Sequence, residues 1–509
     1  MKNHYTILLL CLTVLLSSCA SFERYRLQYN QMVEQSDFTQ AAKLIEKKRF
    51  YKKDRNRVLY YLELGALARM QGDLAKSNEY LNKADYLIED RRSSLGKQGL
   101  SMLSNPRVTP YQTEYFENIA VHYLKSLNFL QLGDLSAARV EARRTNIRLQ
   151  ELNDAVPDKP LKYNDDVLGH IVMGLSYEAN GEWNNAFIAY RNAAELFIED
   201  GQVHPYMGVS MPEQLKCDLV RLAELNGFAG EASRYERILR PRCKAQVGEG
   251  GSLVVFWENG QGPIKEENII GFNILRNSNT GELRFVNQQY GLNYSFGRQT
   301  YNEYNGFEGV NSLRVALPAF RDRQYPLRGA QIKYPGGVKD LEMVENLNVV
   351  AEQSLRDRFG RELANALIRL AAKEAVEAGL RSIKTKKKSE DDEDGEEKKN
   401  DEGEEKDEEE EYSETLGIIL GATANIVNTV TERADIRSWQ SLPAEIFYRR
   451  VPLKKGDNAI TVSFFNHYNQ RMETHQFHIR GNGGLQVHNL ITPDARVIPT
   501  TTTKQQIKP

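Results

Sequence analysis

Cys19 is the residue whose setting most strongly predicts chemistry, because a short apolar stretch and two small residues come directly before it. The chain opens with a single Lys, is apolar over residues 7–16 and then reads Leu16-Ser17-Ser18. A helix that spans a bilayer needs about twenty apolar residues, and this stretch has about half that number. The pattern is typical of a secretory signal with small residues at its cleavage point. We therefore expect residues 1–18 to be a signal peptide.

The residues around Cys19 resemble the lipobox of bacterial lipoproteins, with Leu three places before the cysteine and two serines between. This resemblance implies that Cys19 becomes the first residue of the mature chain and carries acyl chains such as palmitate, so residues 19–21 form a lipidated N-terminus. Ala20 and Ser21 follow with no Asp for retention at the inner membrane, which implies an anchor on the periplasmic face of the outer membrane. The alternative is an ordinary signal peptide with a chance cysteine.

Cys217 and Cys243 are the thiols that remain once Cys11 leaves with the signal and Cys19 is acylated. In an oxidising compartment a disulfide between them would stabilise the fold by roughly 3 kcal/mol. It would join the last helix of the first domain to the segment after Pro241. Two buried thiols remain the alternative, since the sequence does not show that the two residues are close.

Signals for catalysis or metal binding are weak. The chain has no G-x-S-x-G turn, no phosphate-binding G-x-x-x-x-G-K-[ST] and no H-E-x-x-H. His475 and His478 stand three apart and would face opposite sides of a strand, which favours scattered surface histidines over a metal site. The acidic stretch near Asp392 lacks the spacing of a calcium loop. We expect no catalytic residue, no metal and no cofactor, hence a protein that is not an enzyme.

Charge is distributed very unevenly along the chain. The formal net charge is −2, but residues 389–411 hold 16 Asp or Glu against 3 Lys. The rest of the mature chain is therefore basic by about ten charges. In the periplasm this balance indicates phosphorylated lipid head groups, cell-wall polymers or acidic proteins as partners, and no nucleic acid.

A cluster of cations lies about thirty residues after Cys19. We call it the basic cluster, and it consists of Lys47, Lys48, Arg49, Lys52, Lys53, Arg55 and Arg57. Near an anionic membrane each such charge contributes up to about 1 kcal/mol, so contact with lipid head groups is one interpretation. A solvated helix edge is the other.

Residues 22–245 read as pairs of helices. Four segments share an apolar helix, a Gly-centred turn and a second helix with Ala and aromatic residues; their turn glycines are Gly72, Gly133, Gly181 and Gly227. Glycine permits the positive φ that ends a helix, and alanine lets two helices approach closely. This is the pattern of tetratricopeptide-like (TPR-like) repeats, although the intervals of 61, 48 and 46 residues are longer than 34. We predict an irregular α-solenoid.

Beyond residue 247 the apolar period changes to two. Residues 248–338 and 439–498 are predicted to form one β-sandwich-like domain in two parts. Between them, residues 339–438 predict an inserted helical hairpin whose acidic loop, residues 385–412, is too charged to order. Residues 499–509 are expected to be a disordered tail. The fold class is thus α+β and multidomain.

The run from Ala434 to Pro443 is the most specific piece of a wider resemblance. With the segments around Gly133, Gly174 and Trp257, it is similar to a largely uncharacterised bacterial family of TPR-like outer-membrane lipoproteins. The motif is A-D-x-R-S-W-x-x-L-P, and its residues are Asp435, Arg437, Ser438, Trp439, Leu442 and Pro443. From their chemistry, Arg437 can fork to a carboxylate and Trp439 can bury a large surface, which predicts a tie between domains. A binding site at that junction is the alternative.

Together these features predict a lipid-anchored periplasmic scaffold or adaptor of the cell envelope that binds protein partners through its helices. Family members are often encoded near a lipoprotein that activates cell-wall synthases, so the resemblance also implies a second possibility. That possibility is a regulator or activator of a cell-wall synthase or secretion complex. A peptidoglycan-binding or hydrolytic protein is a third.

Overall fold

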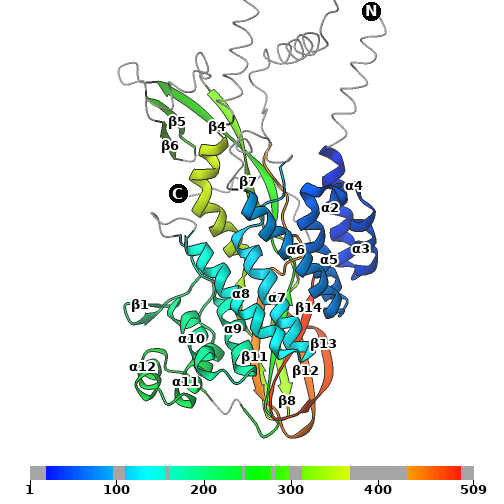
Figure 1. Cartoon of the computed structure of the whole chain (residues 1–509), viewed down its shortest axis with the longest axis vertical. Coiled ribbons are helices and arrows are strands. Elements are labelled where there is room, and N and C mark those ends of the chain that lie inside the picture. Colours follow the sequence, from blue (N-terminus) through cyan, green and yellow to red (C-terminus); the bar gives the residue numbers. More distant parts are fainter. Residues whose placement is uncertain are drawn as a thin grey trace, which may run out of the picture.

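The protein is a mixed chain of helices and strands, as the sequence predicts (Figure 1). The computed structural model describes residues 19–95, 109–154, 161–243, 247–276, 282–289, 291–296, 312–366, 369 and 433–494. The expected signal peptide (1–18), acidic loop (385–412) and tail (499–509) lie outside these residues, and so do residues 413–432 of the predicted hairpin. Within the described part, no helix is both long enough and apolar enough to cross a membrane.

The helices of the first half form an array of antiparallel hairpins. They are α2 (Cys19–Glu34), α3 (Phe38–Lys47), α4 (Arg49–Lys52), the 3₁₀ turn η1 (Asp54–Asn56), α5 (Arg57–Met70), α6 (Leu74–Leu95), α7 (Tyr115–Leu132), α8 (Leu135–Asp154), α9 (Val167–Ala179), α10 (Trp183–Glu195), α11 (Glu213–Leu225) and α12 (Ala229–Leu239). The pairs α5–α6, α7–α8, α9–α10 and α11–α12 are the four predicted hairpins. Their turn glycines have φ between +73° and +80°, the left-handed region that glycine adopts at little cost.

Close helix packing follows the predicted rule that a small residue in the first helix receives a large one from the second. A Cβ built on Gly174 of α9 would lie 2.6 Å from the ring of Tyr190 of α10. Tyr190 is fully buried, and Ala186 and Ala193 beside it on α10 are also inaccessible. The α9–α10 contact is therefore possible only because position 174 has no side chain.

The hairpin formed by α2 and α3 was not among the four predicted pairs, because its turn at Ser36 has no glycine. Ser36 itself has φ +57°, and Asp37 caps α3 by accepting a hydrogen bond from the Gln40 amide at 3.1 Å. Gln71, beside the glycine turn of α5–α6, donates to Thr39 at the start of α3. The turns of the first and second hairpins thus lie at the same end of the array.

The strands form three four-stranded sheets and a small two-stranded ribbon in the described part. They are β1 (Ile198–Glu199), β2 (Gln202–Val203), β3 (Ser252–Asn259), β4 (Ile264–Arg276), β5 (Leu283–Asn287), β6 (Leu292–Phe296), β7 (Ser312–Arg321), β8 (Leu327–Tyr334), β9 (Gly337–Asp340), β10 (Glu342–Asn346), β11 (Glu445–Pro452), β12 (Gly456–Asn466), β13 (Arg471–Gly481) and β14 (Leu485–Thr492). The inner sheet has the order β10-β11-β3-β14, and the outer sheet has the order β13-β12-β8-β9. In the inner sheet β14 runs parallel to β3, while the other pairs are antiparallel.

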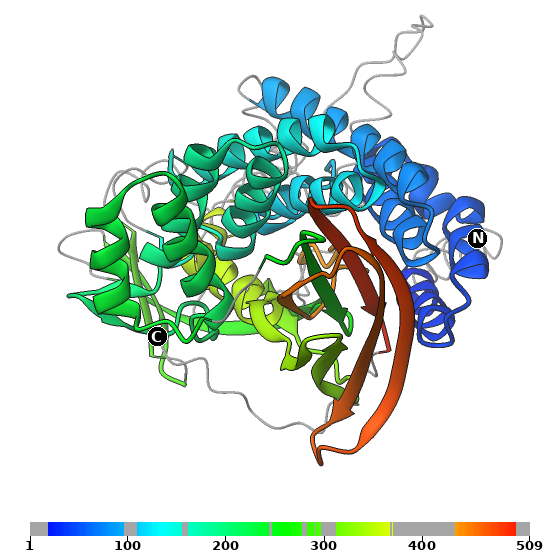
Figure 2. The same ribbon diagram turned by 90° about the horizontal axis from the view of Figure 1, so that it is seen from below.

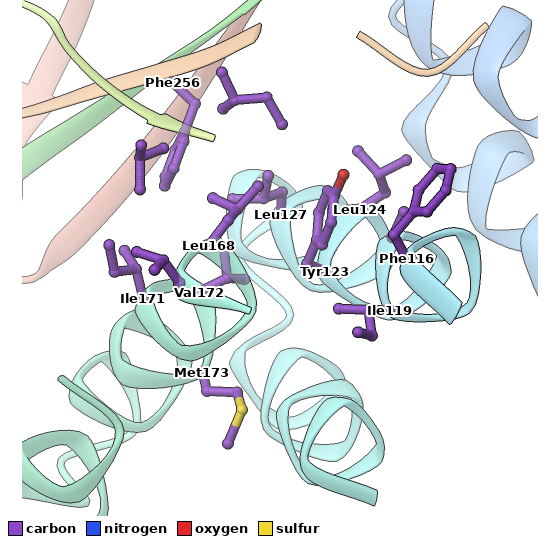
Figure 3. Close-up of a cluster of buried hydrophobic side chains, with 14 of the residues drawn as sticks. Phe116, Ile119, Tyr123, Leu124, Leu127, Leu168, Ile171, Val172, Met173 and Phe256 are labelled. Atoms are coloured by element: carbon purple, nitrogen blue, oxygen red, sulfur yellow. The ribbon is translucent and has the colours of Figure 1, made fainter. Parts of the chain in front are cut away.

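Strand β3 is buried on both faces, so all eight of its residues are inaccessible. Val254 and Phe256 on one face join the core of the helical array, and Figure 3 shows Phe256 facing Leu168, Ile171 and Val172 of α9. Residues of the other face, including Trp257, pack against strands of the outer sheet. The helices curve in an arc around the inner sheet (Figure 2). The concave side of the array is therefore filled by the chain's own strands.

The structure divides the second half differently from the sequence expectation. Strands β4 to β7 do not join the inner and outer sheets but form a third sheet, β6-β5-β4-β7. Its apolar face packs against a helix of residues 347–366 through Leu363 and Ala366. Residues 248–338 are thus not one part of a single sandwich. The predicted insertion 339–438 also holds β10, a strand of the inner sheet, because its apolar residues extend the core of that sheet.

The close approach at Gly174 gives a stability prediction. The change Gly174→Ala should lower the free energy of unfolding by about 1–3 kcal/mol, since the new methyl group overlaps the buried Tyr190 ring. The matched control is Gly230→Ala in α12, where a Cβ would meet no atom within 4 Å. That change should leave stability equal or up to about 1 kcal/mol higher. Urea unfolding followed by circular dichroism measures both, and equal effects would contradict the packing argument.

Candidate functional site

The junction segment, which we define as residues 433–443, runs between the helices and the sheets and contains the predicted motif. Arg437 forks to Asp435 within the segment, with Nε–Oδ1 at 2.8 Å and Nη2–Oδ2 at 2.6 Å. The same guanidinium donates to Asn56 Oδ1 at 2.7 Å and to the Thr109 carbonyl at 3.1 Å. Arg437 is buried, as are Ser438, Trp439 and Leu442. The motif thus attaches the segment to the helical array.

Two buried glutamates of the array accept hydrogen bonds from the backbone of this segment. Glu117 of α7 accepts from the Trp439 amide at 2.9 Å. Glu63 of α5 accepts from the Gln440 amide at 2.9 Å and from the Ser441 hydroxyl at 2.5 Å. Burial raises the pKa of both carboxyl groups. A buried polar group costs free energy unless it is hydrogen-bonded. The two glutamates are satisfied by the segment, and they hold it against the helical array.

Further buried ion pairs connect the helices to the inner sheet. Arg450 of β11 is fully buried and holds both oxygens of Glu178 of α9 at 2.8 Å, with Asp218 of α11 at 3.0 Å from its Nε. Arg69 of α5 pairs with Glu258 of β3, and both are almost inaccessible. These ion pairs stabilise the fold, because removing one partner would leave an uncompensated charge in the interior.

Beside the junction segment lies a cavity of about 250 Å³, which we call the arginine cavity. Its lining residues are Val58, Ile88, Arg91, Tyr111, Gln112, Thr113, Tyr115, Asn118, Arg148, Glu151, Arg358 and Arg361. The contributors from the helical array lie near the start of α5 and α7 and toward the end of α6 and α8, away from the glycine turns, while Arg358 and Arg361 come from the helix of residues 347–366. Burial and the positive charge of Arg437 lower the pKa of Arg91. Among the lining residues, the charged side chains are those of the four arginines and of Glu151.

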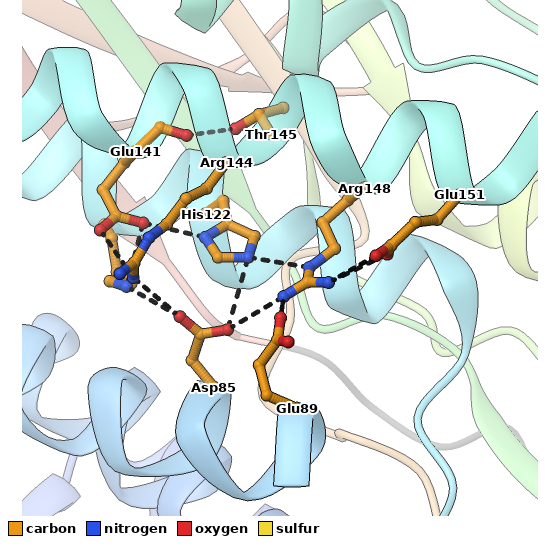
Figure 4. A network of polar contacts seen from close by, with 9 residues as sticks. Asp85, Glu89, His122, Glu141, Arg144, Thr145, Arg148 and Glu151 are labelled. Atoms are coloured by element: carbon orange, nitrogen blue, oxygen red, sulfur yellow. Dashed lines mark hydrogen bonds and ion pairs between the residues drawn. The ribbon is translucent and has the colours of Figure 1, made fainter. Parts of the chain in front are cut away.

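The wall behind Arg148 is a buried charge network between α6, α7 and α8 (Figure 4). Arg148 bonds Glu151 at 2.9 Å and also pairs with Glu89, while Lys125 lies 2.9 Å from Glu141. Burial alone would raise the pKa of Asp85 at the centre of the network. The surrounding His122, Lys125 and Arg148 hold that pKa below its usual range. These mutual pairs fix Arg148 in position at the cavity wall.

The basic cluster occupies the end of α3, α4 and η1. Lys47, Arg49, Lys52 and Lys53 are exposed, and Lys48, Arg55 and Arg57 are partly exposed. The cluster adjoins the arginine cavity, since Arg91 donates to the Asp54 carbonyl and the Tyr111 amide donates to the Arg55 carbonyl. Figure 1 places α4 near the end of α2 at which Cys19 begins that helix. The anchor candidate, the cluster and the cavity are therefore at one end of the array.

The remaining predicted residues are found in separate places. Cys217 and Cys243 form a disulfide with a Cα–Cα distance of 5.6 Å. Cys217 lies in α11, so the bridge starts from the helix before the last one and not from α12. His475 pairs with Glu473 and His478 with Asp457 on the outer sheet. In the described ranges, no group of three or more His, Cys, Asp or Glu could hold a metal ion.

Sequence reasoning did not identify Glu63, Glu117 or the cavity arginines. The available signal was a charged residue on an apolar helix face, as in Leu62-Glu63-Leu64, where a carboxylate needs a buried partner. The partners themselves could not be found this way. Arg148 and Arg358, which share one cavity, are far apart in the chain.

Comparisons with known proteins add little. No protein-family model matches the chain, and no curated protein matches it. Among solved structures, the crystal structure of MamA is 18% identical over 42% of this chain and 92% of that one, with a TM-score of 0.26. A putative kinesin light chain of Podosopora anserina with TPR-like repeats is 14% identical over 43% and 93%, with a TM-score of 0.27. A tetratricopeptide repeat protein from Parabacteroides merdae is 14% identical over 45% and 82%, with a TM-score of 0.20. At such TM-scores the likeness carries no argument, and the helical hairpins are established by this chain's own packing.

The pair of Glu178 and Arg450 predicts a pH-dependent stability. Burial alone would raise the pKa of Glu178, but Arg450 and Arg221 outweigh it and lower the pKa to about 2. The ionised group therefore contributes stability that is fully present above the unfolded value near 4.5 and is lost as pH falls toward 2. Its size is about 3 kcal/mol. Urea unfolding should show that Glu178→Gln is destabilising at pH 7 and that its deficit relative to the unmodified protein shrinks below pH 4.5.

The control for this experiment is Glu182→Gln, which removes the partly exposed pair with Arg139. It should change stability by less than about 1 kcal/mol. A deficit for Glu178→Gln that stays constant between pH 7 and pH 3 would contradict the assigned role of its charge.

Proposed function

We propose that the protein is a lipid-anchored scaffold or adaptor of the bacterial cell envelope that binds other proteins and catalyses no reaction. Cys19 would carry the lipid on the periplasmic face of the outer membrane. Helix α2 begins at Cys19 itself, so the array would start at the membrane surface with no spacer. The supports for this placement are the lipobox-like sequence and the cations beside the anchor.

The observation that supports the scaffold proposal most directly is the buried interface between the helices and the inner sheet. Apolar contacts of β3 and ion pairs such as Arg450 with Glu178 join the two parts. The buried charges bond one another and so are engaged in holding the fold. A body of this kind supplies a fixed platform, which is what a scaffold requires.

Because the inner sheet fills the concave side of the helical array, we expect partners to bind elsewhere on the array. Helical-repeat arrays commonly bind partners on the concave surface, and here the inner sheet occupies it. Protein partners would therefore contact the outer surface, where the hairpin turns expose large apolar side chains. Leu132 is 51% exposed, Trp183 is 42% exposed and Leu225 is 54% exposed. The Asn226 side chain donates to the Trp183 carbonyl at 3.0 Å, so the last two of these turns are in contact.

The anchor is tested by Cys19→Ser. Loss of acylation removes the hydrophobic insertion that holds a lipoprotein, at about 0.8 kcal/mol per buried methylene. Membrane fractionation should find the unmodified protein in the outer-membrane fraction and the variant outside it. The control is Cys217→Ser with Cys243→Ser, which removes the disulfide and leaves the anchor. If Cys19→Ser remains membrane-bound, the proposed anchoring is wrong.

Partner binding is tested by photocrosslinking in cells at Trp183 and Leu225, with exposed Tyr86 on α6 as the control position. A scaffold predicts one or a few protein adducts of defined stoichiometry from the first two positions and fewer from Tyr86. Retention on purified sacculi without a protein adduct would instead support a glycan binder. Glycan cleavage by the pure protein would overturn the non-enzymatic assignment.

Contact of the basic cluster with lipid is a separate prediction. Changing Lys47, Arg49, Lys52 and Lys53 to Glu should weaken association of the unlipidated Cys19→Ser protein with anionic liposomes, by up to about 1 kcal/mol per charge. Added salt should reduce the difference, because exposed charges are screened. Unchanged liposome binding after charge reversal would assign the cluster to a solvated helix edge.

A further inference from the structure

The arginine cavity has the composition of a binding site for a small anion. Two of its arginines, Arg358 and Arg361, project from the helix of residues 347–366, and Arg148 faces them from α8. Val58 and Ile88 supply an apolar part of the wall. Pockets for small molecules typically combine apolar lining with a few convergent polar groups. This combination is present here at a volume of about 250 Å³.

Carboxylates pair with the arginines of the cavity unevenly, and Arg148 pairs with three of them, Asp85, Glu89 and Glu151. Glu114 pairs with Arg358 and also with Lys265, so one carboxylate serves two cations. Burial alone would raise the pKa of Glu114, but these two cations outweigh it and lower the pKa to about 2, which keeps Glu114 ionised. Arg361 is exposed and pairs with no carboxylate among the described residues. An anion in the cavity would supply Arg361 with a charged partner and would lie beside Arg358.

Two buried polar atoms of the lining also lack hydrogen-bond partners within the described part of the chain. They are Nε of Arg358, a donor, and Oδ1 of Asn118, an acceptor. Each such atom is destabilising when it is buried without a partner. A ligand that both accepts from an arginine and donates to an amide oxygen would satisfy the two together.

We propose that the arginine cavity binds the phosphate monoester of a small hydroxylated molecule, of the glycerol phosphate type. The phosphate accepts from Arg358 and Arg361, because guanidinium groups match its oxygens in geometry and charge. Its several acceptor oxygens suit a wall with more than one arginine. A hydroxyl of the carbon skeleton donates to Asn118 Oδ1, and the skeleton contacts Val58 and Ile88.

The glycerol phosphate group could come from two kinds of molecule, a free phosphate ester or a lipid that carries it as its head group. Cys19, the basic cluster and the cavity share one end of the helical array. If Cys19 is acylated, that end faces the membrane and a lipid head group is within reach. Only this choice of source rests on the proposed anchoring. Binding to the cavity itself does not depend on it.

The test is titration calorimetry on the purified full-length protein in neutral detergent. The probes are sn-glycerol 3-phosphate, inorganic phosphate and uncharged glycerol. We expect saturable one-to-one binding of glycerol 3-phosphate and none of glycerol. Arg361→Gln should weaken the binding at least about tenfold, since it removes a charge-assisted hydrogen bond. The matched control is Arg356→Gln on the same helix, whose side chain pairs with Glu352 and does not line the cavity.

Asn118→Ala separates the two halves of the proposed ligand. It should weaken glycerol 3-phosphate and leave inorganic phosphate unchanged, because only the ester has a hydroxyl for that position. Lysophosphatidic acid in the same micelles carries the same head group on an acyl chain. Tighter binding than the free ester assigns a lipid source, and equal binding assigns a free ester; either result supports the proposal if Arg361→Gln weakens it.

Absence of saturable binding by every phosphate probe would overturn the proposal. So would an equal loss in Arg361→Gln and Arg356→Gln, since that result indicates general charge attraction. Neither outcome bears on the scaffold function, which photocrosslinking at Trp183 and Leu225 tests without the cavity. The failure of one idea is thus distinguishable from the failure of the other.

Discussion

Packing of the inner sheet into the arc of helices is the constraint on which the rest of the structure depends. β3 lies between β11 and β14 and is covered by helices on one face and by the outer sheet on the other. An apolar strand of this kind gains burial on both faces, at about 25 cal/mol per Å². It also leaves the helices no open concave face. The helical array and one face of the inner sheet therefore share one hydrophobic core, while the other face of the inner sheet forms a second core with the outer sheet.

Buried charges at this interface favour one arrangement over others more than they add stability. Taking Arg450, Glu178 and Asp218 out of water has a desolvation cost that their mutual attraction only offsets when the geometry is good. A misplaced strand would leave these charges unpaired at a cost of several kcal/mol. The same reasoning applies to Glu63 and Glu117, which need the junction segment to satisfy them. The polar contacts thus set the register in which helices, segment and strands meet.

Local signals predicted the parts of the fold that local physics determines. The turn glycines at positions 72, 133, 181 and 227 each end a helix by their own backbone freedom, so the four hairpins could be found from the sequence. The first hairpin turns at Ser36 without glycine, and the pattern gave no sign of it. Alternation of apolar residues predicts strands but does not tell which sheet each strand joins. That choice depends on contacts between distant residues, as when β4 to β7 pack against the helix of residues 347–366.

The candidate sites show the same division between local and distant information. The lipobox-like residues before Cys19 form one continuous stretch of sequence, and so does the motif around Arg437, so each can be recognised from the sequence alone. The arginine cavity instead combines residues from four helices and from the insertion. Its location nevertheless follows from simple topology. Each hairpin turns at the glycine end, so the starts of α5 and α7 and the ends of α6 and α8 must gather at the opposite end. Helix α2 begins at that same end. A lipid on Cys19 would therefore bring the cavity and the basic cluster close to the bilayer, and this proximity results from hairpin parity alone.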